Sequence, residues 1–414
     1  MEPVLLPTTI EKFLKAFLKE IGMKDYTTII SSATRPGENF SGIVNRITIN
    51  DRNQKSGANI LNLIIKIAPN NESLRLAFPL RALFEREIYY YTKVFPEFER
   101  LQKEQKTLNS LTVFPKLYKT SLQNLNEALL LEDMNVLGYQ RYEALKTLDY
   151  DHALFVIKEY GKLHALSFVL RYLKPDVFNK LESGTYDHIL RGFPITEARQ
   201  NGYKLRNDQV LACLDVEEDK SAYELYKKFS SKMLDTVEDV VQTEKAGKYG
   251  VLTHGDCWIN NYLFKYEDSS TPSSMCILDW QAARCGSPAL DLSYFLFCCI
   301  SHSLRKEHYW DLIKEYYKSF STFLKTFGLV SEEVFPFSVL KDHLKRFSTY
   351  GLFMAVITLT FTLLQGKGGP SFQTAKNEVE MFSLRKAHNS EDHELYRSRM
   401  RGVVVDFVNF GFEI

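Results

Sequence analysis

The sequence has little that would mark a membrane, secreted or nucleic-acid-binding protein. Its 414 residues carry a formal net charge of +1, so bulk charge does not favour binding to nucleic acid or to a membrane surface. The longest apolar run, Gly351–Leu364, is shorter than the roughly 20 residues that span a bilayer, and it predicts a buried helix. Met1–Pro7 is apolar but too short for a secretory signal. We therefore expect a cytoplasmic protein with no transmembrane segment, no nucleic-acid partner and no obligate protein partner.

Cysteine is also scarce and irregularly spaced. The six cysteines include no Cys-x-x-Cys pair, so neither a disulfide framework nor a zinc ribbon is predicted. Internal repeats and low-complexity tracts are absent as well. What remains is an ordinary globular composition, 45% hydrophobic and 25% charged, in a chain long enough for two domains or one two-lobed unit.

Short strand-like segments dominate the first third of the chain. After an amphipathic helix over Thr8–Ile21, strands are predicted at Tyr26–Ser32 and Ile43–Asn50. The turn-rich loop between these strands carries Gly37 and Gly42, which permit close approach of the backbone to phosphates. From the residues alone, a plain surface hairpin fits this loop equally well.

Lys66 lies near the end of an almost wholly apolar strand, Ile60–Pro69. A lysine in such a place either extends its ammonium group to the surface or meets a buried anionic partner. The helix predicted over Leu83–Val94 offers two candidate partners, Glu85 and Glu87. A strand lysine paired with a helix glutamate positions nucleotide phosphates in kinases. A surface salt bridge, or no pair at all, is the alternative.

The segment Glu127–Met134 is a buried strand that breaks abruptly into a polar loop. Such a break fits a hinge between two lobes, with backbone groups free to bind the edge of an adenine ring. A simple exit from a strand into a loop is the alternative.

From Asp149 onward the pattern becomes mainly helical, with long helices predicted at Tyr150–Leu173 and Ser331–Lys345. His164, on the apolar side of the first of these helices, is expected to be a core residue. Asp291 lies near a predicted helix N-terminus, where a carboxylate can bind free backbone donors, so a structural role is expected for it.

The strongest chemical signal is the stretch Val251–Asp279. Asp256 follows a His-Gly pair, Asn261 comes five residues later, and a predicted β-hairpin ends at Asp279. Phosphoryl transfer needs this set, because one Asp accepts the proton of the attacking hydroxyl while the Asn and the other Asp hold Mg²⁺ against the phosphates. The Asp-x4-Asn spacing is that of the protein-kinase catalytic loop. A metal hydrolase built on His254 and Asp256 would need further ligands at metal spacing, and the other histidines are scattered.

Several motifs, taken in order, resemble the ecdysteroid kinase-like family, whose members are similar to the choline and aminoglycoside kinases of the protein-kinase-like fold. The motifs are GENFSG, LIIK, FEREIYYY, LLLED, KLHALSF, LTHGDCWINN, ILDWQ and GSPALDLSYF. The resemblance runs from about Gly22 to the C-terminus. It implies an α+β, two-lobed protein-kinase-like fold. A small N-terminal antiparallel β lobe plus one helix would occupy residues 1–134, and a larger, mainly helical catalytic and substrate-binding lobe residues 135–414.

The resemblance also implies roles for the motif residues. Asp256 corresponds to the catalytic base, Asn261 and Asp279 to the metal ligands, and Lys66 to the phosphate-binding lysine. Glu87 corresponds to the partner of the lysine, because the family motif Phe-x-x-Glu places the glutamate three residues after a phenylalanine. The other nucleotide-contacting residues implied are those of the glycine loop and the hinge: Gly37, Asn39, Phe40, Ser41, Glu132, Asp133 and Met134. Trp280 replaces the commoner Phe of the family, and this departure removes no charged group.

The implied activity is that of an ATP- and Mg²⁺-dependent small-molecule kinase. It would transfer the γ-phosphate to a hydroxyl of an ecdysteroid or of another hydroxylated metabolite or xenobiotic, in hormone inactivation or detoxification, so its partner would be a small-molecule alcohol. A choline- or ethanolamine-like kinase and a catalytically silent, nucleotide-binding pseudokinase are the alternatives. Six aromatic residues could line a steroid-sized pocket or belong to the core: Trp258, Tyr294, Phe295, Phe347, Tyr350 and Phe353.

Overall fold

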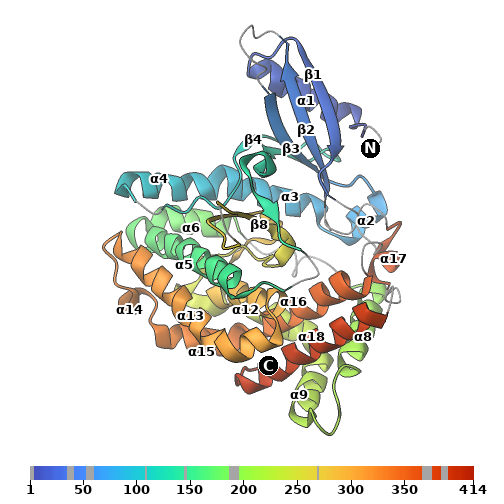
Figure 1. The fold of residues 1–414 in the computed structure, drawn as a ribbon, viewed down its shortest axis with the longest axis vertical. Helices are drawn as coiled ribbons and strands as arrows, with labels where there is room; N and C mark the ends of the chain where they lie inside the picture. The colour runs from blue at the N-terminus through green and yellow to red at the C-terminus, as the bar shows by residue number, and fades with distance from the viewer. Residues whose placement is uncertain are drawn as a thin grey trace.

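The computed structural model describes most of the chain: residues 4–34, 42–52, 60–107, 110–143, 147–185, 195–267, 270–365, 375–383 and 390–414. Gly37, Asn39, Phe40 and Ser41 lie outside the described residues, so the predicted glycine loop is not placed. A β-rich N-terminal part stands above a larger helical part (Figure 1), which is the α+β, two-lobed architecture expected from the sequence.

A five-stranded antiparallel sheet forms the N-terminal part, with strand order β1-β2-β3-β5-β4. Its strands are β1 (Tyr26–Ser32), β2 (Ile43–Asp51), β3 (Ile60–Ile67), β4 (Leu117–Ser121) and β5 (Ala128–Glu132). Helix α1 (Thr8–Glu20) packs its apolar side on alternate residues of β2 and β3, among them Ile47, Ile49, Leu63 and Ile65. Alternate residues are the ones buried because successive side chains of a strand point to opposite faces.

A series of helices crosses the molecule beneath the sheet (Figure 1). It comprises α2 (Glu72–Ala77), α3 (Leu80–Tyr89), the π-helix η1 (Tyr90–Val94) and α4 (Phe95–Gln105). Phe95 and Tyr90 contact Trp280 of the C-terminal part, with ring centroids 4.8 and 5.6 Å from the indole. These helices therefore share a core with both parts of the chain.

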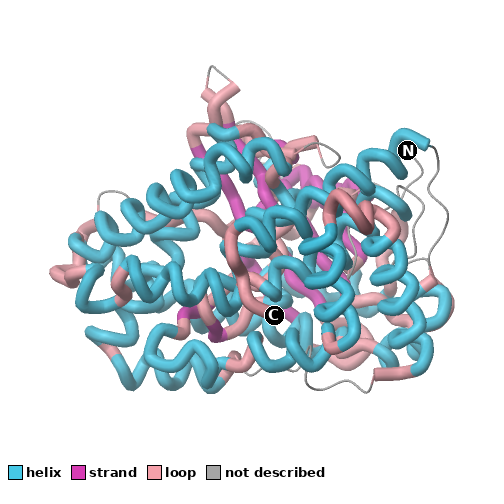
Figure 2. Tube along the Cα trace, turned by 90° about the horizontal axis from the view of Figure 1, so that it is seen from below, coloured by secondary structure: helices cyan, strands magenta, loops and turns pink. Residues whose placement is uncertain are grey.

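Helices make up most of the C-terminal part, as the view from below shows (Figure 2). They are α5 (Tyr150–Leu173), α6 (Pro175–Ser183), α8 (Glu197–Leu211), α9 (Lys220–Ser231), α10 (Met233–Val240), α11 (Thr243–Ala246), α12 (Pro288–Cys299), α13 (His302–Lys325), α14 (Ser331–Val334), α15 (Phe337–Phe347), α16 (Thr349–Leu359), α17 (Glu378–Phe382) and α18 (Ser390–Asn409). The single helix predicted over residues 331–345 is wrong in its extent, because Pro336 separates α14 from α15.

The apolar run Gly351–Leu364 is a buried helix, as predicted, formed by α16 and the π-helix η6 (Thr360–Gln365). A Cβ at Gly351 would lie 2.5 Å from the backbone carbonyl carbon of Ser293, so α12 and α16 touch backbone to backbone. No single described helix is long and apolar enough to cross a membrane. Taken together, Phe337–Phe347 and Thr349–Leu364, which are bent by 50° relative to each other, are long and apolar enough by length and composition alone.

Short strands follow in the C-terminal part, and β8 (Tyr262–Lys265) lies between the crossing helices and the helices below them (Figure 1). Others are β7 (Val251–Leu252), β9 (Ser274–Ile277) and β10 (Cys285–Gly286). β8 pairs with β9 and with β6 (Gln140–Arg141), which follows the 3-10 turn η2 (Met134–Leu137). The β8–β9 pairing is the hairpin predicted from the sequence.

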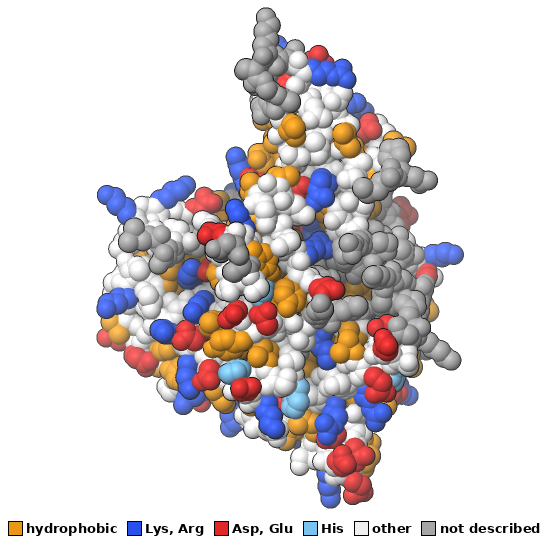
Figure 3. Space-filling model, in the orientation of Figure 1, with side chains coloured by type: hydrophobic (Ala, Val, Ile, Leu, Met, Phe, Trp, Pro, Cys, Tyr) orange, Lys and Arg blue, Asp and Glu red, His pale blue; other side chains and the backbone are white. Residues whose placement is uncertain are grey.

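Basic and acidic side chains are interspersed on the face of the molecule drawn in Figure 3, in keeping with the net charge of +1.

Candidate active site

The β8–β9 hairpin brings Asn261 and Asp279 to one end of the three-stranded sheet β6-β8-β9. Tyr262 pairs with Ile277, so the residues just before β8 and just after β9 lie side by side. The N–H of Leu278 donates to the carbonyl of Asn261 at 2.8 Å. Asp279 has a φ of +64°, a left-handed backbone conformation that is uncommon outside glycine and that often marks functional sites.

Lys66 lies between two carboxylates. Its Nζ is 2.6 Å from Glu87 Oε2 and 2.7 Å from Asp279 Oδ1. Strand β3 places the lysine and helix α3 places Glu87, and both side chains are buried. Burial acts to lower the pKa of Lys66, but the two carboxylates outweigh burial and raise the pKa above its usual range. The ammonium group therefore stays charged inside the protein.

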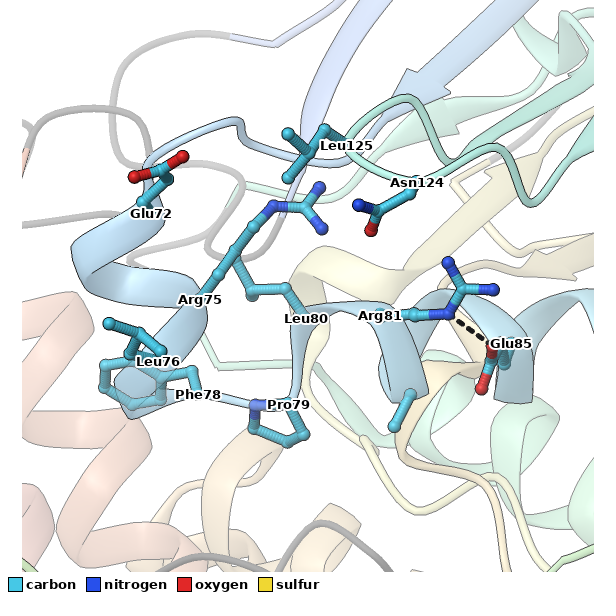
Figure 4. A pocket seen from close by; sticks show the side chains of 11 residues that line it. Glu72, Arg75, Leu76, Phe78, Pro79, Leu80, Arg81, Glu85, Asn124 and Leu125 are labelled. Atoms are coloured by element: carbon cyan, nitrogen blue, oxygen red, sulfur yellow. Dashed lines mark hydrogen bonds and ion pairs between the residues drawn. The ribbon is translucent and has the colours of Figure 1, made fainter.

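Glu85, the other candidate partner of Lys66, faces away from it. Residues two apart on a helix point to different sides. Glu85 accepts a hydrogen bond from Arg81 at 2.8 Å and lines a surface groove of about 660 Å³ (Figure 4). This groove lies between α2, α3 and the β4–β5 loop, and Lys66 does not line it. The partner of Lys66 is therefore Glu87.

Asp256 is partly buried and is held by two donors. The Tyr294 hydroxyl donates to its Oδ1 at 2.9 Å, and Asn261 Nδ2 donates to its Oδ2 at 2.8 Å. Burial, together with the charge of Asp279, raises the pKa of Asp256, while both hydrogen bonds act to lower it. Asn261 Nδ2 also donates to the carbonyl of Asp256 at 2.9 Å. Since both partners are acceptors, the amide nitrogen faces Asp256 and the amide oxygen is directed away from it.

Asp291 holds the loop that carries Asp256. Its carboxylate accepts the backbone N–H groups of His254 at 2.7 Å and Gly255 at 2.9 Å, and a ring nitrogen of His164 lies at 3.2 Å. Asp291 thus has the expected structural role. However, the backbone N–H groups that it binds belong to the Asp256 loop and not to the N-terminus of its own helix, α12, which Ser287 caps. His164 is fully buried, as expected of a core residue.

Gly255 is required by the backbone of this loop. Its φ is +81°, and a Cβ there would lie only 2.2 Å from the carbonyl oxygen of Ala282. The neighbouring His254 is buried, with Nε2 2.9 Å from the carbonyl of Leu278 and Nδ1 3.3 Å from the Tyr160 hydroxyl. The imidazole thus connects the Asp256 loop to the strand that leads into Asp279.

A metal hydrolase, the alternative that the sequence disfavours, would need further metal ligands beside His254 and Asp256. Among the residues that the structure describes, no group of three or more His, Cys, Asp or Glu side chains could hold a metal ion. With its ring nitrogens engaged by Leu278 and Tyr160, His254 is oriented as a structural residue.

The predicted hinge residues connect strand β5 to η2 and contact the hairpin through Met134. The buried carboxylate of Asp133 accepts from Arg46 Nε at 2.5 Å and from the N–H of Asn135 at 3.1 Å. Because that side chain is engaged within the protein, any nucleotide contact of Asp133 would come from its backbone. Met134 packs against Leu263 and Cys276 of the hairpin sheet. Glu132 ends strand β5.

Two tyrosines support this site through hydrogen bonds that the sequence does not predict. Tyr294 binds Asp256, and the Tyr350 hydroxyl donates to the carbonyl of Gly255 at 3.0 Å. The spacing of Asp291 and Tyr294, three residues apart and hence on one side of a helix, was the available signal. All six aromatic residues that could have been pocket or core are buried: Trp258, Tyr294, Phe295, Phe347, Tyr350 and Phe353.

The structure thus connects Lys66, Glu87 and Asp279 in one ion-pair cluster and Asp256 with Asn261 in a second contact. The two are adjacent because Asn261 and Asp279 flank the same hairpin. The functional roles of these five residues stay predictions. A strand lysine held by a helix glutamate above an Asp-x4-Asn loop, in a two-lobed α+β chain, defines a kinase-like phosphotransferase.

The chain belongs to the ecdysteroid kinase-like family, whose model matches residues 36–329. It is accordingly a small-molecule kinase, a phosphotransferase that acts on hydroxyl groups. Among solved structures it is similar to a GDP complex of a point mutant of an aminoglycoside 2′-phosphotransferase IIIa. The identity is 14%, the coverage 94% of this chain and 96% of the other, and the TM-score 0.42, too low to bear on fold or function. No curated protein sequence matches the chain.

Proposed function

We propose that this kinase transfers the γ-phosphate of ATP to a hydroxyl group of an ecdysteroid or of another hydroxylated metabolite or xenobiotic. The observation that carries the proposal is the Lys66–Glu87–Asp279 cluster, which meets one end of the β8–β9 hairpin at Asp279, where Asn261 of the Asp256–Asn261 contact also lies. The acceptor class is inferred from the family to which the chain belongs. We place the activity in the cytoplasm, in hormone inactivation or detoxification.

The site is suited to Mg·ATP between an N-terminal lobe, residues 1–134, and a C-terminal lobe, residues 135–414. Adenine would lie against Leu131–Met134, and Lys66, held by Glu87, would bind the phosphates. The amide oxygen of Asn261 and the carboxylate of Asp279 are the oxygen ligands that Mg²⁺ prefers. Asp279 is close enough to Asp256 to raise its pKa, so a bound cation would relieve a repulsion that this structure contains. When bound, magnesium neutralises charge on the phosphates.

Asp256 would act as the base in the chemical step. Its carboxylate would orient the acceptor hydroxyl and take its proton while the hydroxyl oxygen forms a bond to the γ-phosphorus. The bond between that phosphorus and the β–γ bridging oxygen breaks, and ADP leaves. Catalysis of this kind rests mainly on positioning and on electrostatic stabilisation, which agrees with the two hydrogen bonds that hold Asp256.

A substrate screen tests the acceptor class. Purified protein with Mg·ATP would be incubated with ecdysteroids, choline and plant phenolics, and products detected by the mass gained with one phosphate. Phosphorylation of choline alone would contradict the proposed acceptor. Absence of product with every alcohol, together with no ATP consumption, would indicate the pseudokinase instead.

Replacement of Asp256 by Asn tests the proposed base. The amide keeps the shape of the side chain but cannot take a proton, so kcat should fall by about 10²–10⁴-fold, and the Kd for ATP should stay nearly unchanged. Turnover by rapid quench and nucleotide binding by calorimetry separate the two quantities. Wild-type turnover in Asp256→Asn would rule out this assignment.

A further inference from the structure

A side chain outside the predicted set reaches the carboxylate of Asp256. Tyr294 is 1% exposed in helix α12, and its hydroxyl donates to Asp256 Oδ1 at 2.9 Å. The opposite oxygen, Oδ2, is held by Asn261. Asp256 itself stands on an irregular loop, so its rotamer depends on these two contacts rather than on regular backbone structure.

A second hydroxyl sets the direction of the Tyr294 hydrogen bond. Thr358 Oγ1 of α16 lies 3.0 Å from the Tyr294 hydroxyl oxygen. A tyrosine hydroxyl has one proton, and an ionised carboxylate can only accept. With the tyrosine proton given to Asp256, the threonine must donate to the tyrosine oxygen. The result is a chain of two donors, Thr358 to Tyr294 to Asp256.

The helices that carry this chain are firmly packed. α12 and α16 touch backbone to backbone at Gly351, and Tyr350 of α16 binds the carbonyl of Gly255, the residue before Asp256. Both Tyr294 and Thr358 are buried. The two hydroxyls are therefore fixed in place by the core, which allows them to orient a loop side chain to within the tolerance that chemistry needs.

We propose that Tyr294 is a positioning residue for phosphoryl transfer, and that Thr358 fixes the direction of its hydroxyl. Tyr294 keeps the Asp256 carboxylate turned toward the acceptor hydroxyl, so its contribution falls on the chemical step and not on nucleotide binding. The inference rests on the proposed role of Asp256 as the base.

Tyr294→Phe tests the inference because it removes only the hydroxyl. Loss of one hydrogen bond to a charged group should lower kcat about tenfold, with the KM for ATP within about twofold of wild type. The assay uses Mg·ATP with the best alcohol from the screen and, in parallel, Mg·ATP alone with water as the acceptor. Tyr226→Phe is the matched control, since Tyr226 is also buried and its hydroxyl donates to Asn207 at 2.6 Å, a bond that joins α9 to α8 and involves no residue of the site.

A pair of threonine variants keeps the inference testable if Tyr294→Phe folds poorly. Thr358→Val removes the hydroxyl with little change in volume and should lower kcat severalfold, whereas Thr358→Ser should recover most of that loss. Equal kcat for Tyr294→Phe and wild type, or for Thr358→Val and Thr358→Ser, overturns the inference. If Asp256→Asn is fully active, the assignment of the base has failed instead, and the two failures are thus distinct.

Discussion

At the scale of single residues, the site depends on one buried cation between two buried or partly buried anions. Lys66 contacts both Glu87 and Asp279, and its own pKa is raised by them. Removing one partner of a buried ion pair lowers the free energy of unfolding, because it leaves an uncompensated charge inside the protein. The cluster therefore links the stability of the protein to its proposed nucleotide chemistry.

We predict that Lys66→Met lowers the free energy of unfolding by about 3–5 kcal/mol, because Glu87 loses its counter-ion. Glu87→Gln in the Lys66→Met background should restore part of this stability, since it removes the unpaired charge. Urea unfolding of wild type, Lys66→Met, Glu87→Gln and the double variant measures the coupling energy between the two residues. Lys103→Met, which breaks an exposed pair with Glu99, should cost at most about 1 kcal/mol. Strict additivity in the Lys66–Glu87 cycle would contradict the prediction.

At the scale of helices, the start of α3 is attached to α8 and α17 of the C-terminal part through Arg199. Arg199 of α8 lies with its guanidinium 5.2 Å from the Phe78 ring and 5.5 Å from the Phe382 ring. The two rings stack on each other at 5.7 Å, and Arg199 also donates to the carbonyl of Ala77 at 2.9 Å. Phe78 lies between α2 and α3, so this cluster joins α8 and α17 to the start of the helix that carries Glu87.

Arg199→Ala should loosen this attachment. We predict a loss of about 1–3 kcal/mol in the free energy of unfolding, from the cation–π contacts, one hydrogen bond and the ion pair of Arg199 with Glu378 at 3.5 Å. The KM for ATP should rise severalfold, because Glu87 would hold Lys66 less firmly. Thermal unfolding and initial rates at varied ATP measure the two effects. Arg401→Ala, which breaks the pair with Asp219 between α18 and α9, is the control and should leave the KM for ATP unchanged. A wild-type KM for Arg199→Ala would argue against the coupling.

At the scale of the whole molecule, a single large hydrophobic core extends from α3 and α4 through the hairpin to α18. His343 lies at its edge, with Nδ1 2.8 Å from the hydroxyl of Ser287, the residue that caps α12. Burial, helped by the charge of Arg346, lowers the pKa of His343 to about 4. The unfolded chain would have the ordinary value of about 6.5.

This difference predicts a pH dependence of stability. Because the folded-state pKa is the lower one, the stabilisation by neutral His343 is fully present above about pH 6.5 and is lost as pH falls toward about 4. The slope is at most about 1.4 kcal/mol per pH unit. His343→Gln should show a shallower loss of stability between pH 7 and pH 5, measured by urea unfolding. His393→Gln, at an exposed position on α18, is the control and should keep the wild-type slope. Identical slopes in His343→Gln and wild type would refute the prediction.

The parts of the fold set by local spacing could be predicted from the sequence. The strand Tyr26–Ser32 and the helix Tyr150–Leu173 have the predicted bounds, and the β8–β9 hairpin lies where its apolar runs and polar turn indicated. Periodicity identifies such elements because one side of each must be buried. The single helix predicted over Ser331–Lys345 is too long. The apolar pattern continues through Pro336, but a proline has no backbone N–H for the helical hydrogen bond and interrupts the helix there.

The sequence by itself indicated the class of reaction, because Asn261 and Asp279 flank one hairpin whose register is set by local backbone geometry, and Asp256 lies in the short loop before it. Only the tertiary structure decided which distant groups complete the site. Lys66 and Asp279 are 213 positions apart, and their contact depends on how the sheet and the hairpin pack. For the same reason, spacing alone could not identify Glu87 as the partner of Lys66, the Asp256 loop as the partner of Asp291, or Tyr294 as a ligand of Asp256.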